Sequence, residues 1–319
     1  MSLAGIHHVS AITKAAPENV QFYVTYLGMR MVKKTVNQDD PSMYHLFYGD
    51  EVGNPGTELT FFEIPMMSKN KNGNNSISSI GLRVLNDEAL SYWQNRFNEL
   101  GIEHDDIAER NGQQTLAFRD CEGQRLMLIS DERNEGVAGG VPWTNGGIPE
   151  AYAIRGLGPI QLTVPYGELT AQVLTDLLGF RKTGEFPSTV AGQRDIVVFE
   201  TGEGGNGATI HVEERKDLRR EHQGQGGVHH VAFRVKDETE LHQWIKKIQA
   251  RDLPNSGFIN RYYFRSFYFR EPNGILFELA TDGPGFDRDE DVAHLGEKLS
   301  LPPFLEKKRA AIEANLKPL

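Results

Sequence analysis

The chain has a single cysteine and no long apolar run. Cys121 is the only cysteine among 319 residues, so no internal disulfide forms. Its neighbours Asp120, Glu122 and Gly123 suggest a turn and offer no basic group to activate the thiol, which favours a structural role. No segment approaches the roughly 18 apolar residues of a membrane span, and the N-terminus does not resemble a signal peptide. The expected location is the cytoplasm.

Positive charge is also scarce. Lys and Arg number 34 against 44 Asp and Glu, which gives a formal net charge of −10. No basic block with interleaved aromatic residues offsets this balance, so the sequence argues against a nucleic-acid surface. With 39% apolar residues, the chain is long enough for about two domains with a large core. The classes of partner that remain are small molecules and proteins, which include a second copy of the chain.

An internal duplication organises the chain. A shift of 151 residues superimposes its two halves without a gap. The shift matches Gly28 with Gly179, Gly56 with Gly207, and AFRDCEGQRLMLISD (117–131) with YFREPNGILFELATD (268–282). The chain is therefore a duplicated pair.

Each half contains two copies of a smaller unit. A short β-rich run, an amphipathic helical stretch and further short β-rich runs indicate a βαβββ module, and hence an α+β fold. The four modules are expected at 4–66, 76–132, 153–215 and 226–282. They make up a first pair within 1–135 and a second pair within 153–282, separated by a Gly- and Pro-rich linker at 136–152 and followed by a tail at 283–319 that contains a helix.

Specific motifs carry a family resemblance. Histidine pairs open the first and fourth modules, in GIHHVSAIT (5–13) and GGVHHVAFRV (226–235), and EPNGILFEL closes the fourth. Together these resemble the vicinal oxygen chelate superfamily of glyoxalases, antibiotic-resistance proteins and extradiol dioxygenases. With KKTVNQDDPSMYHLFYGD in the first half, the chain resembles bacterial hydroquinone-type ring-cleaving dioxygenases closely. The resemblance implies two incomplete barrels, each curled from a pair of modules.

Strand alternation selects one histidine from each pair. His230 shares a strand face with Ala232 and Arg234, whereas His229 shares the apolar face expected to pack on the module's helix. His230 therefore faces the concave side, and by the same alternation so does His8. His7 and His229 are then expected to be buried or capping residues bonded to backbone groups.

Glu278 stands alone among apolar residues in the last strand of the fourth module, GILFELAT. Burying a carboxylate in such surroundings costs several kcal/mol of hydration free energy, and a neighbouring cation is needed to offset that cost. Glu278 is therefore either a metal ligand or the partner of an arginine, for which Arg234 and Arg270 are the candidates. His8, His230 and Glu278 are the predicted metal ligands.

The duplication tests this assignment within the sequence. His8 matches Pro159, His230 matches Ser79 and Glu278 matches Met127, so one metal site is expected, not two. His8 reaches the other two ligands only if module one shares a barrel with module four. Modules two and three then form a second, metal-free barrel.

The ligand set points to a reaction class. Two imidazoles and one carboxylate leave open positions on Fe(II), with Mn(II) as a metal that the same ligands would accept. The function expected is an Fe(II)-dependent extradiol-type ring-cleaving dioxygenase that acts on hydroquinone- or catechol-like aromatic diols with O₂. A glyoxalase-type isomerase would need a fourth ligand at Thr60, and a ligand-sequestering protein would need no metal; both stay open.

Two further site residues follow from the resemblance. Tyr268 lies ten residues before Glu278, a spacing at which extradiol dioxygenases carry a tyrosine that hydrogen-bonds the substrate hydroxyl. A core tyrosine is the alternative. His222, in the polar loop REHQGQGG, is the candidate acid/base histidine, with an exposed loop histidine as the alternative. His211, which matches Thr60, is expected to be structural.

Overall fold

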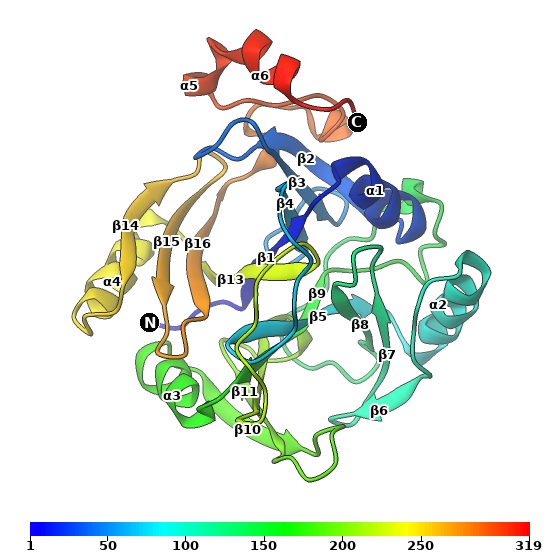
Figure 1. Ribbon diagram of the computed structural model, residues 1–319, viewed down its shortest axis with the longest axis vertical. Helices are drawn as coiled ribbons and strands as arrows, with labels where there is room; N and C mark the ends of the chain where they lie inside the picture. Colours follow the sequence, from blue (N-terminus) through cyan, green and yellow to red (C-terminus); the bar gives the residue numbers. More distant parts are fainter.

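A computed structural model describes residues 1–319 and contains two eight-stranded sheets, each curled into an incomplete barrel (Figure 1). The first barrel consists of β1 (Ile6–Thr13), β2 (Arg30–Val36), β3 (Tyr44–Gly49), β4 (Glu58–Glu63), β13 (Gly227–Val235), β14 (Asn255–Asn260), β15 (Phe264–Arg270) and β16 (Leu276–Pro284). The second barrel consists of β5 (Ser76–Val84), β6 (Ala108–Arg110), β7 (Gln113–Arg119), β8 (Arg125–Ser130), β9 (Leu157–Val164), β10 (Arg181–Phe186), β11 (Ile196–Glu200) and β12 (Thr209–Glu214).

Helices follow the first strand of each module, on the outside of the barrels (Figure 1). Asn86 and Asp237 cap α2 and α4 by accepting hydrogen bonds from the backbone N–H of Ala89 and Glu240, as expected of short polar side chains at helix N-termini. The remaining helical segments are short. The helices are α1 (Ala16–Val20) with η1 (Gln21–Tyr26), α2 (Asp87–Leu100), α3 (Gly167–Gln172) with η3 (Val173–Leu177), α4 (Glu238–Gln249), α5 (Pro303–Glu306) and α6 (Arg309–Asn315), with single turns η2 (Thr144–Gly146), η4 (Asn206–Ala208), η5 (Phe286–Arg288) and η6 (Val292–His294).

The crossed pairing of modules predicted from the sequence is confirmed. The first barrel runs β14-β15-β16-β13-β1-β4-β3-β2, which joins module four to module one through the antiparallel pair β1 and β13. The second barrel runs β10-β11-β12-β9-β5-β8-β7-β6, which joins module three to module two. Exchanging the halves of the chain converts one order into the reverse of the other. The two barrels are thus related by a pseudo-twofold.

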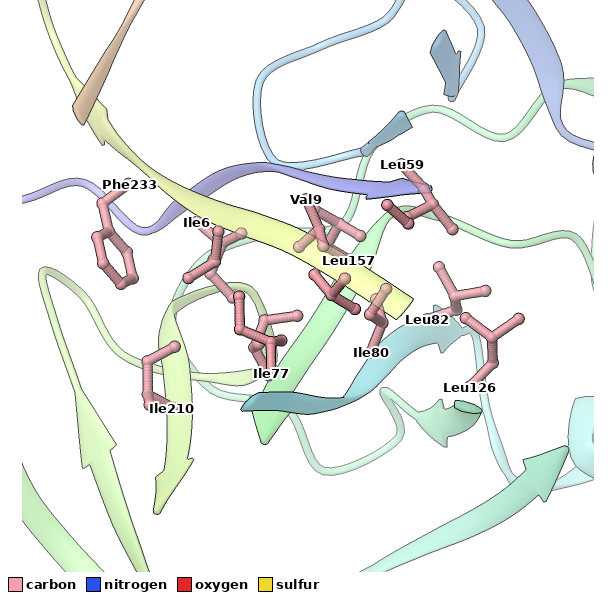
Figure 2. Packing of buried hydrophobic residues seen from close by; sticks show 14 of the residues in the cluster. Ile6, Val9, Leu59, Ile77, Ile80, Leu82, Leu126, Leu157, Ile210 and Phe233 are labelled. Atoms are coloured by element: carbon pink, nitrogen blue, oxygen red, sulfur yellow. The ribbon is translucent and has the colours of Figure 1, made fainter. Parts of the chain in front are cut away.

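The barrels share one hydrophobic core. Val9 of the first barrel packs toward Leu157 and Ile80 of the second, within a single cluster of 54 buried residues (Figure 2). Phe233 of β13 belongs to the same cluster and contacts Phe180 of module three, with ring centroids 5.3 Å apart. The apolar face of β13 therefore packs on the other barrel as well as on α4, whose Leu241 and Trp244 belong to the same cluster. The sequence predicted the contact with the helix but not the contact with the second barrel, because strand alternation does not say which layers cover a face.

The C-terminal tail crosses the free edge of the first barrel. Ser300 donates its backbone N–H to the carbonyl oxygen of Lys34 in β2, and Leu301, Leu305 and Ile312 pack with Val36. Figure 1 shows α5 and α6 beside this edge strand. The tail thus covers a sheet edge, which would otherwise present unpaired backbone groups. No helix of the chain has both the length and the apolar character needed to cross a bilayer.

Candidate metal centre

Two β-bulges shape the centre of the first barrel. In the register between β1 and β13, His7 is an extra residue between Ile6 and His8, and His229 is an extra residue between Val228 and His230. A bulge places an additional residue against the partner strand and re-aims neighbouring side chains. His229 consequently lines the same pocket as His230, which corrects the prediction that alternation puts it on the opposite, apolar face.

The structure brings together His8, His230 and Glu278. The Nε2 atoms of His8 and His230 lie 3.1 and 2.8 Å from Oε2 of Glu278, and 3.2 Å from each other. His8 and His230 are buried, and Glu278 is 0% exposed. Arg234 instead pairs with Asp282, and Arg270 donates to the carbonyl oxygen of Gly274. The arginine partner considered for Glu278 is therefore absent.

Hydrogen bonds fix the tautomer of His8. Nε2 of His7 lies 3.1 Å from the carbonyl oxygen of Thr281, which only accepts, so this nitrogen carries the proton. Burial, reinforced by the charge of His8, lowers the pKa of His7 to about 3, so its ring is neutral and its Nδ1 is an acceptor. Nδ1 of His8, 3.0 Å away, then donates to it. The lone pair of His8 Nε2 is left pointing toward Glu278.

His230 has a matching partner. Its Nδ1 lies 2.7 Å from Nδ1 of His229, whose pKa is lowered to about 3 by burial, with the charge of His230 adding to the effect. For His230 to offer Nε2 to a cation, its Nδ1 proton must be donated to His229. The first histidine of each pair thus orients the second, a supporting role that ligand histidines commonly require.

The donor set fits a divalent cation. Although Glu278 lies within 3.1 Å of both Nε2 atoms, neither of its oxygens has an aligned hydrogen-bond donor. Burial raises the pKa of Glu278, but positive charge on the neighbouring imidazoles would lower it well below its usual range. A cation held by the three groups would supply that charge instead, so the carboxylate is ionised while both imidazoles stay neutral. Two imidazole nitrogens and a carboxylate oxygen therefore converge with lone pairs facing one point, as Fe(II) and Mn(II) sites require.

A second group of potential ligands lies nearby but does not have this character. Ligand atoms of His7, His8 and Glu58 also lie within 4.8 Å of one another. The facing Nδ1 atoms of His7 and His8 already share a proton, and Nδ1 of His7 lies 3.8 Å from Glu58. Burial, followed by the charge of Asp50, raises the pKa of Glu58 well above its usual range, which makes it a neutral acid. The group around Glu278 is the stronger cation site.

A cavity of about 350 Å³ is lined by His8 and His230, and Glu278 is buried directly behind them. Tyr268 also lines this cavity, with its ring centroid 5.4 Å from that of His230. Burial, with the Glu278 carboxylate adding to the effect, raises the pKa of Tyr268 above its ordinary value, so the phenol stays protonated and is a donor. The Arg261 guanidinium lies 5.6 Å from the centre of the Tyr268 ring and is paired with Asp39 at 2.9 Å. The pocket therefore combines a phenol donor with a fixed positive charge.

His45 is a pocket residue that the sequence reasoning missed. Its ring lies between Phe47 and Phe62, with both ring centroids 4.1 Å away. Nε2 of His45 contacts Oγ1 of Thr60 at 3.0 Å, and Thr60 contacts Oγ of Ser10 at 2.7 Å. Burial, with the charges of His8 and His230, lowers the pKa of His45 well below its usual value. The duplication offered a signal, because the matching residue is Ile196.

His222 lies outside the cavity. It is exposed, and its Nε2 faces the hydroxyl of Ser68 at 3.4 Å, while its backbone pairs with Lys71. The structure therefore does not bring this candidate acid/base residue to the other predicted site residues. The course of the loop explains the difference, because residues 215–226 run beside the segment around Lys71 instead of entering the barrel.

The corresponding place in the second barrel has no such donor set. Ser79, Met127 and Pro159 stand where His230, Glu278 and His8 stand in the first. His211 is buried there against Phe186, with ring centroids 5.0 Å apart. It belongs to no group of potential metal ligands. The hydroxyl of Thr60, which matches His211, bonds to Ser10 and His45, so it does not act as the fourth ligand of an isomerase-type centre.

Comparisons with known proteins agree with this arrangement. The model of the glyoxalase/bleomycin resistance protein/dioxygenase superfamily matches residues 5–128 and 156–279. MhqA of Bacillus subtilis (strain 168), provisionally named a ring-cleaving dioxygenase, is 57% identical over 319 residues, covering 100% of both chains. The chlorohydroquinone/hydroquinone 1,2-dioxygenase of Sphingobium indicum is 29% identical over 309 residues, 95% of this chain and 92% of that one.

A solved structure shows the same fold. The crystal structure of a provisionally named dioxygenase from Bacillus subtilis (strain 168) superimposes with a TM-score of 0.90 at 34% identity. The match covers 99% of this chain and 97% of that chain. The arrangement of modules therefore extends over the full length of both proteins.

Proposed function

The chain belongs to the glyoxalase/bleomycin resistance protein/dioxygenase superfamily, and from this membership and the geometry of the centre we propose that it is a ring-cleaving dioxygenase for hydroquinone-type aromatic diols. His8, His230 and Glu278 hold the metal, Fe(II) in this proposal, with Mn(II) compatible with the same ligands. The observation that carries the proposal is the convergence of Oε2 of Glu278 with the Nε2 atoms of His8 and His230, two residues that line the cavity.

The metal would supply the Lewis acidity and the one-electron chemistry with O₂ that amino-acid side chains lack. The residues around it bind and orient the substrate. Phe47 and Phe62 line the cavity on either side of His45 and offer apolar surface against which an aromatic substrate packs. Tyr268 donates a hydrogen bond from its phenolic O–H to an oxygen of the diol, and the Arg261 guanidinium stabilises negative charge that develops there.

His45 takes the acid/base role in this proposal. It is neutral, lines the cavity and is oriented by Thr60. A neutral imidazole beside the substrate is able to accept a hydroxyl proton and return it later. The exposed His222 has no path to the same position, since Ser68 and Lys71 hold it on the outer loop.

The test is oxygen uptake by anaerobically Fe(II)-loaded protein. Consumption of one O₂ per hydroquinone, with loss of aromatic absorbance, is the expected result, and catechol serves as the comparison diol. His45→Ala is expected to lower kcat by about 10²–10⁴-fold, the range for a general acid/base. His222→Ala is its matched control and is expected to retain full activity.

Three outcomes would count against the proposal or a part of it. Isomerisation of a substrate without O₂ consumption would favour a glyoxalase-type activity. Stoichiometric binding of an aromatic ligand by metal-free protein, with no turnover after metal loading, would favour sequestration. Equal losses in the His45 and His222 variants would reject His45 as the acid/base residue.

A further inference from the structure

The second barrel retains a cavity in the position that corresponds to the metal centre. This cavity of about 270 Å³ is bordered by β5, β7, β8, β9 and β12. Most of its lining residues correspond, under the 151-residue shift, to residues that line the cavity of the first barrel. Ser79 matches His230, Ala117 matches Tyr268 and Gln161 matches Ser10. Both halves of the chain thus keep the cavity, but the second barrel lacks the side chains that could hold a metal.

The replacements increase the positive charge of the cavity. Arg125 stands where the first barrel has Leu276, and Arg215 stands where it has Ile64. Arg110 matches Arg261, but the carboxylate partner Asp39 of Arg261 is replaced by Val190. An ion pair of the first cavity has thus lost its acidic half in the second.

Arg110 and Arg125 make no hydrogen bond or ion pair with protein groups. The guanidinium groups of Arg119 and Arg215 are already used, since Arg119 pairs with Glu103 at 3.0 Å and Arg215 pairs with Asp217 at 2.7 Å. Neither Arg110 nor Arg125 has such a partner, although both line the cavity and are partly buried. Burial lowers the pKa of Arg125, and the charges of Glu221 and Glu213 oppose this effect without reaching ion-pair distance.

The acidic residues of the cavity do not fill this role. Glu213 is buried and accepts hydrogen bonds from Thr163, Gln161 and Ser188. Glu103 pairs with Arg119, and Asp105 is exposed. No carboxylate forms an ion pair with Arg110 or Arg125, so both guanidinium groups keep their hydrogen-bond donors available at the cavity. In a protein with a net charge of −10, a pocket with two free arginines is a local reversal of sign.

We propose that the cavity of the second barrel binds a small organic carboxylate through Arg110 and Arg125. The guanidinium group presents a planar fork of donors that matches a carboxylate. Ala117, Leu126 and Val190 add an apolar surface that suits the hydrocarbon part of an organic acid. Inorganic phosphate has no such part. The size of the cavity lies just below the roughly 300 Å³ at which small-molecule sites begin, so the ligand has few heavy atoms. The proposal is independent of the activity of the first barrel.

Calorimetric titration of the full-length, metal-free protein with cis,cis-muconate tests this site. The expected result is saturable binding of one muconate per chain at constant ionic strength. Arg125→Leu installs the residue of the first barrel and is expected to weaken binding at least tenfold, about 1.4 kcal/mol. Arg125→Lys keeps the positive charge but lacks the planar pair of donors. Its affinity for muconate is expected to lie between those of the wild type and Arg125→Leu. Arg110→Gln is expected to weaken binding independently, which guards against misfolding of a single variant.

Two controls locate the ligand. Arg133→Leu removes an exposed arginine outside the cavity, whose side chain donates only to the carbonyl oxygen of Gly112, and is expected to leave binding unchanged. Glu278→Met alters the first barrel and is also expected to leave it unchanged. Loss of muconate binding in Glu278→Met but not in Arg125→Leu would place the ligand in the first barrel and overturn the proposal. Inorganic phosphate binding as tightly as muconate, or no saturation at about 10 mM muconate, would overturn it as well.

Discussion

Replacing Glu278 by methionine tests the metal centre most directly. Methionine is the residue that the second barrel carries at the matching position, Met127, so the fold already accommodates it. In the first barrel the change removes the only carboxylate among three convergent donors. We expect the variant to fold and to lose its response to metal.

The size of the response follows from mass action and chain length. A metal at one hundred times its Kd stabilises the native state by about 2.7 kcal/mol. Unfolding entropy of about 2.1 cal/mol/K per residue gives about 0.7 kcal/mol/K for 319 residues that unfold together, as the shared core of 54 residues indicates. The wild-type Tm is therefore expected to rise by about 4 °C, whereas the Tm of Glu278→Met is expected to stay constant.

The measurement is thermal unfolding with and without buffered Mn(II), repeated anaerobically with Fe(II). Glu58→Gln is the matched control, because burial raises the pKa of Glu58 well above its usual range and glutamine is an isosteric replacement for the neutral acid. It tests the neighbouring group of His7, His8 and Glu58. A full metal response in Glu278→Met together with its loss in Glu58→Gln would refute the assignment and move the cation to that group.

Three other changes probe neighbouring features. Tyr268→Phe removes the phenol donor and is expected to lower kcat about 10²–10³-fold while metal affinity, measured by titration, stays unchanged; an equal loss of metal affinity would contradict the role of a substrate donor. His7→Phe removes the acceptor of the His8 Nδ1 proton, so nitrogen-15 NMR of the metal-free protein should show His8 changing from one tautomer to a mixture, and metal affinity should fall about 10–100-fold; a single unchanged tautomer would exclude this positioning role. Burial lowers the pKa of His211 to about 4 from 6.5, so the unfolded state binds an extra proton between these values and stability is lost as the pH falls from 6.5 to 4. Over that pH range the free energy of unfolding of His211→Phe, measured by denaturant titration, should therefore fall by about 3 kcal/mol less than that of the wild type. The same dependence of unfolding free energy on pH in both proteins would contradict the lowered pKa of His211.

The sequence predicted the parts of the structure that depend on alternation and duplication. The crossed pairing followed because His8 could meet His230 and Glu278 in no other way, and the strand order confirms it. Neither argument could locate the two bulges. A bulge arises where the registers of two paired strands differ, and the register between β1 and β13 involves segments more than 200 residues apart.

Sequence reasoning also could not decide which histidines outside the motifs face the cavity. His222 lies in a loop and His45 lies in β3, and only the path of the chain around the barrel decides which of them lines the cavity. β3 carries His45 inward because it is hydrogen-bonded to β4 and follows the curvature of the barrel. The loop with His222 runs beside the segment at Lys71 and stays outside. The internal comparison did contain a clue for His45, which matches Ile196, but no comparable clue existed for Arg261, which matches another arginine.

The same comparison explains how one fold supports a metal centre on one side and an arginine-lined cavity on the other. On the convex faces, Val9 matches Ile160, and Leu59 matches Ile210; Ile80 likewise matches Val231. These side chains form the common core between the barrels (Figure 2). Because a change there disturbs the packing of both barrels, both halves keep apolar residues of similar size.

On the concave faces each barrel surrounds its own cavity, and a substitution there contacts no residue of the other barrel's cavity. Glu278 is replaced by Met127, and Leu276 by Arg125, without any change in strand order. On one strand, the residues of the convex face must therefore fit the core that both barrels share, whereas the residues of the concave face need to fit only their own cavity. Arg125→Leu and Glu278→Met should therefore have additive effects on the free energy of unfolding, since they share no contact. A coupling energy above about 0.5 kcal/mol in the double variant would show that the cavities communicate through the shared core.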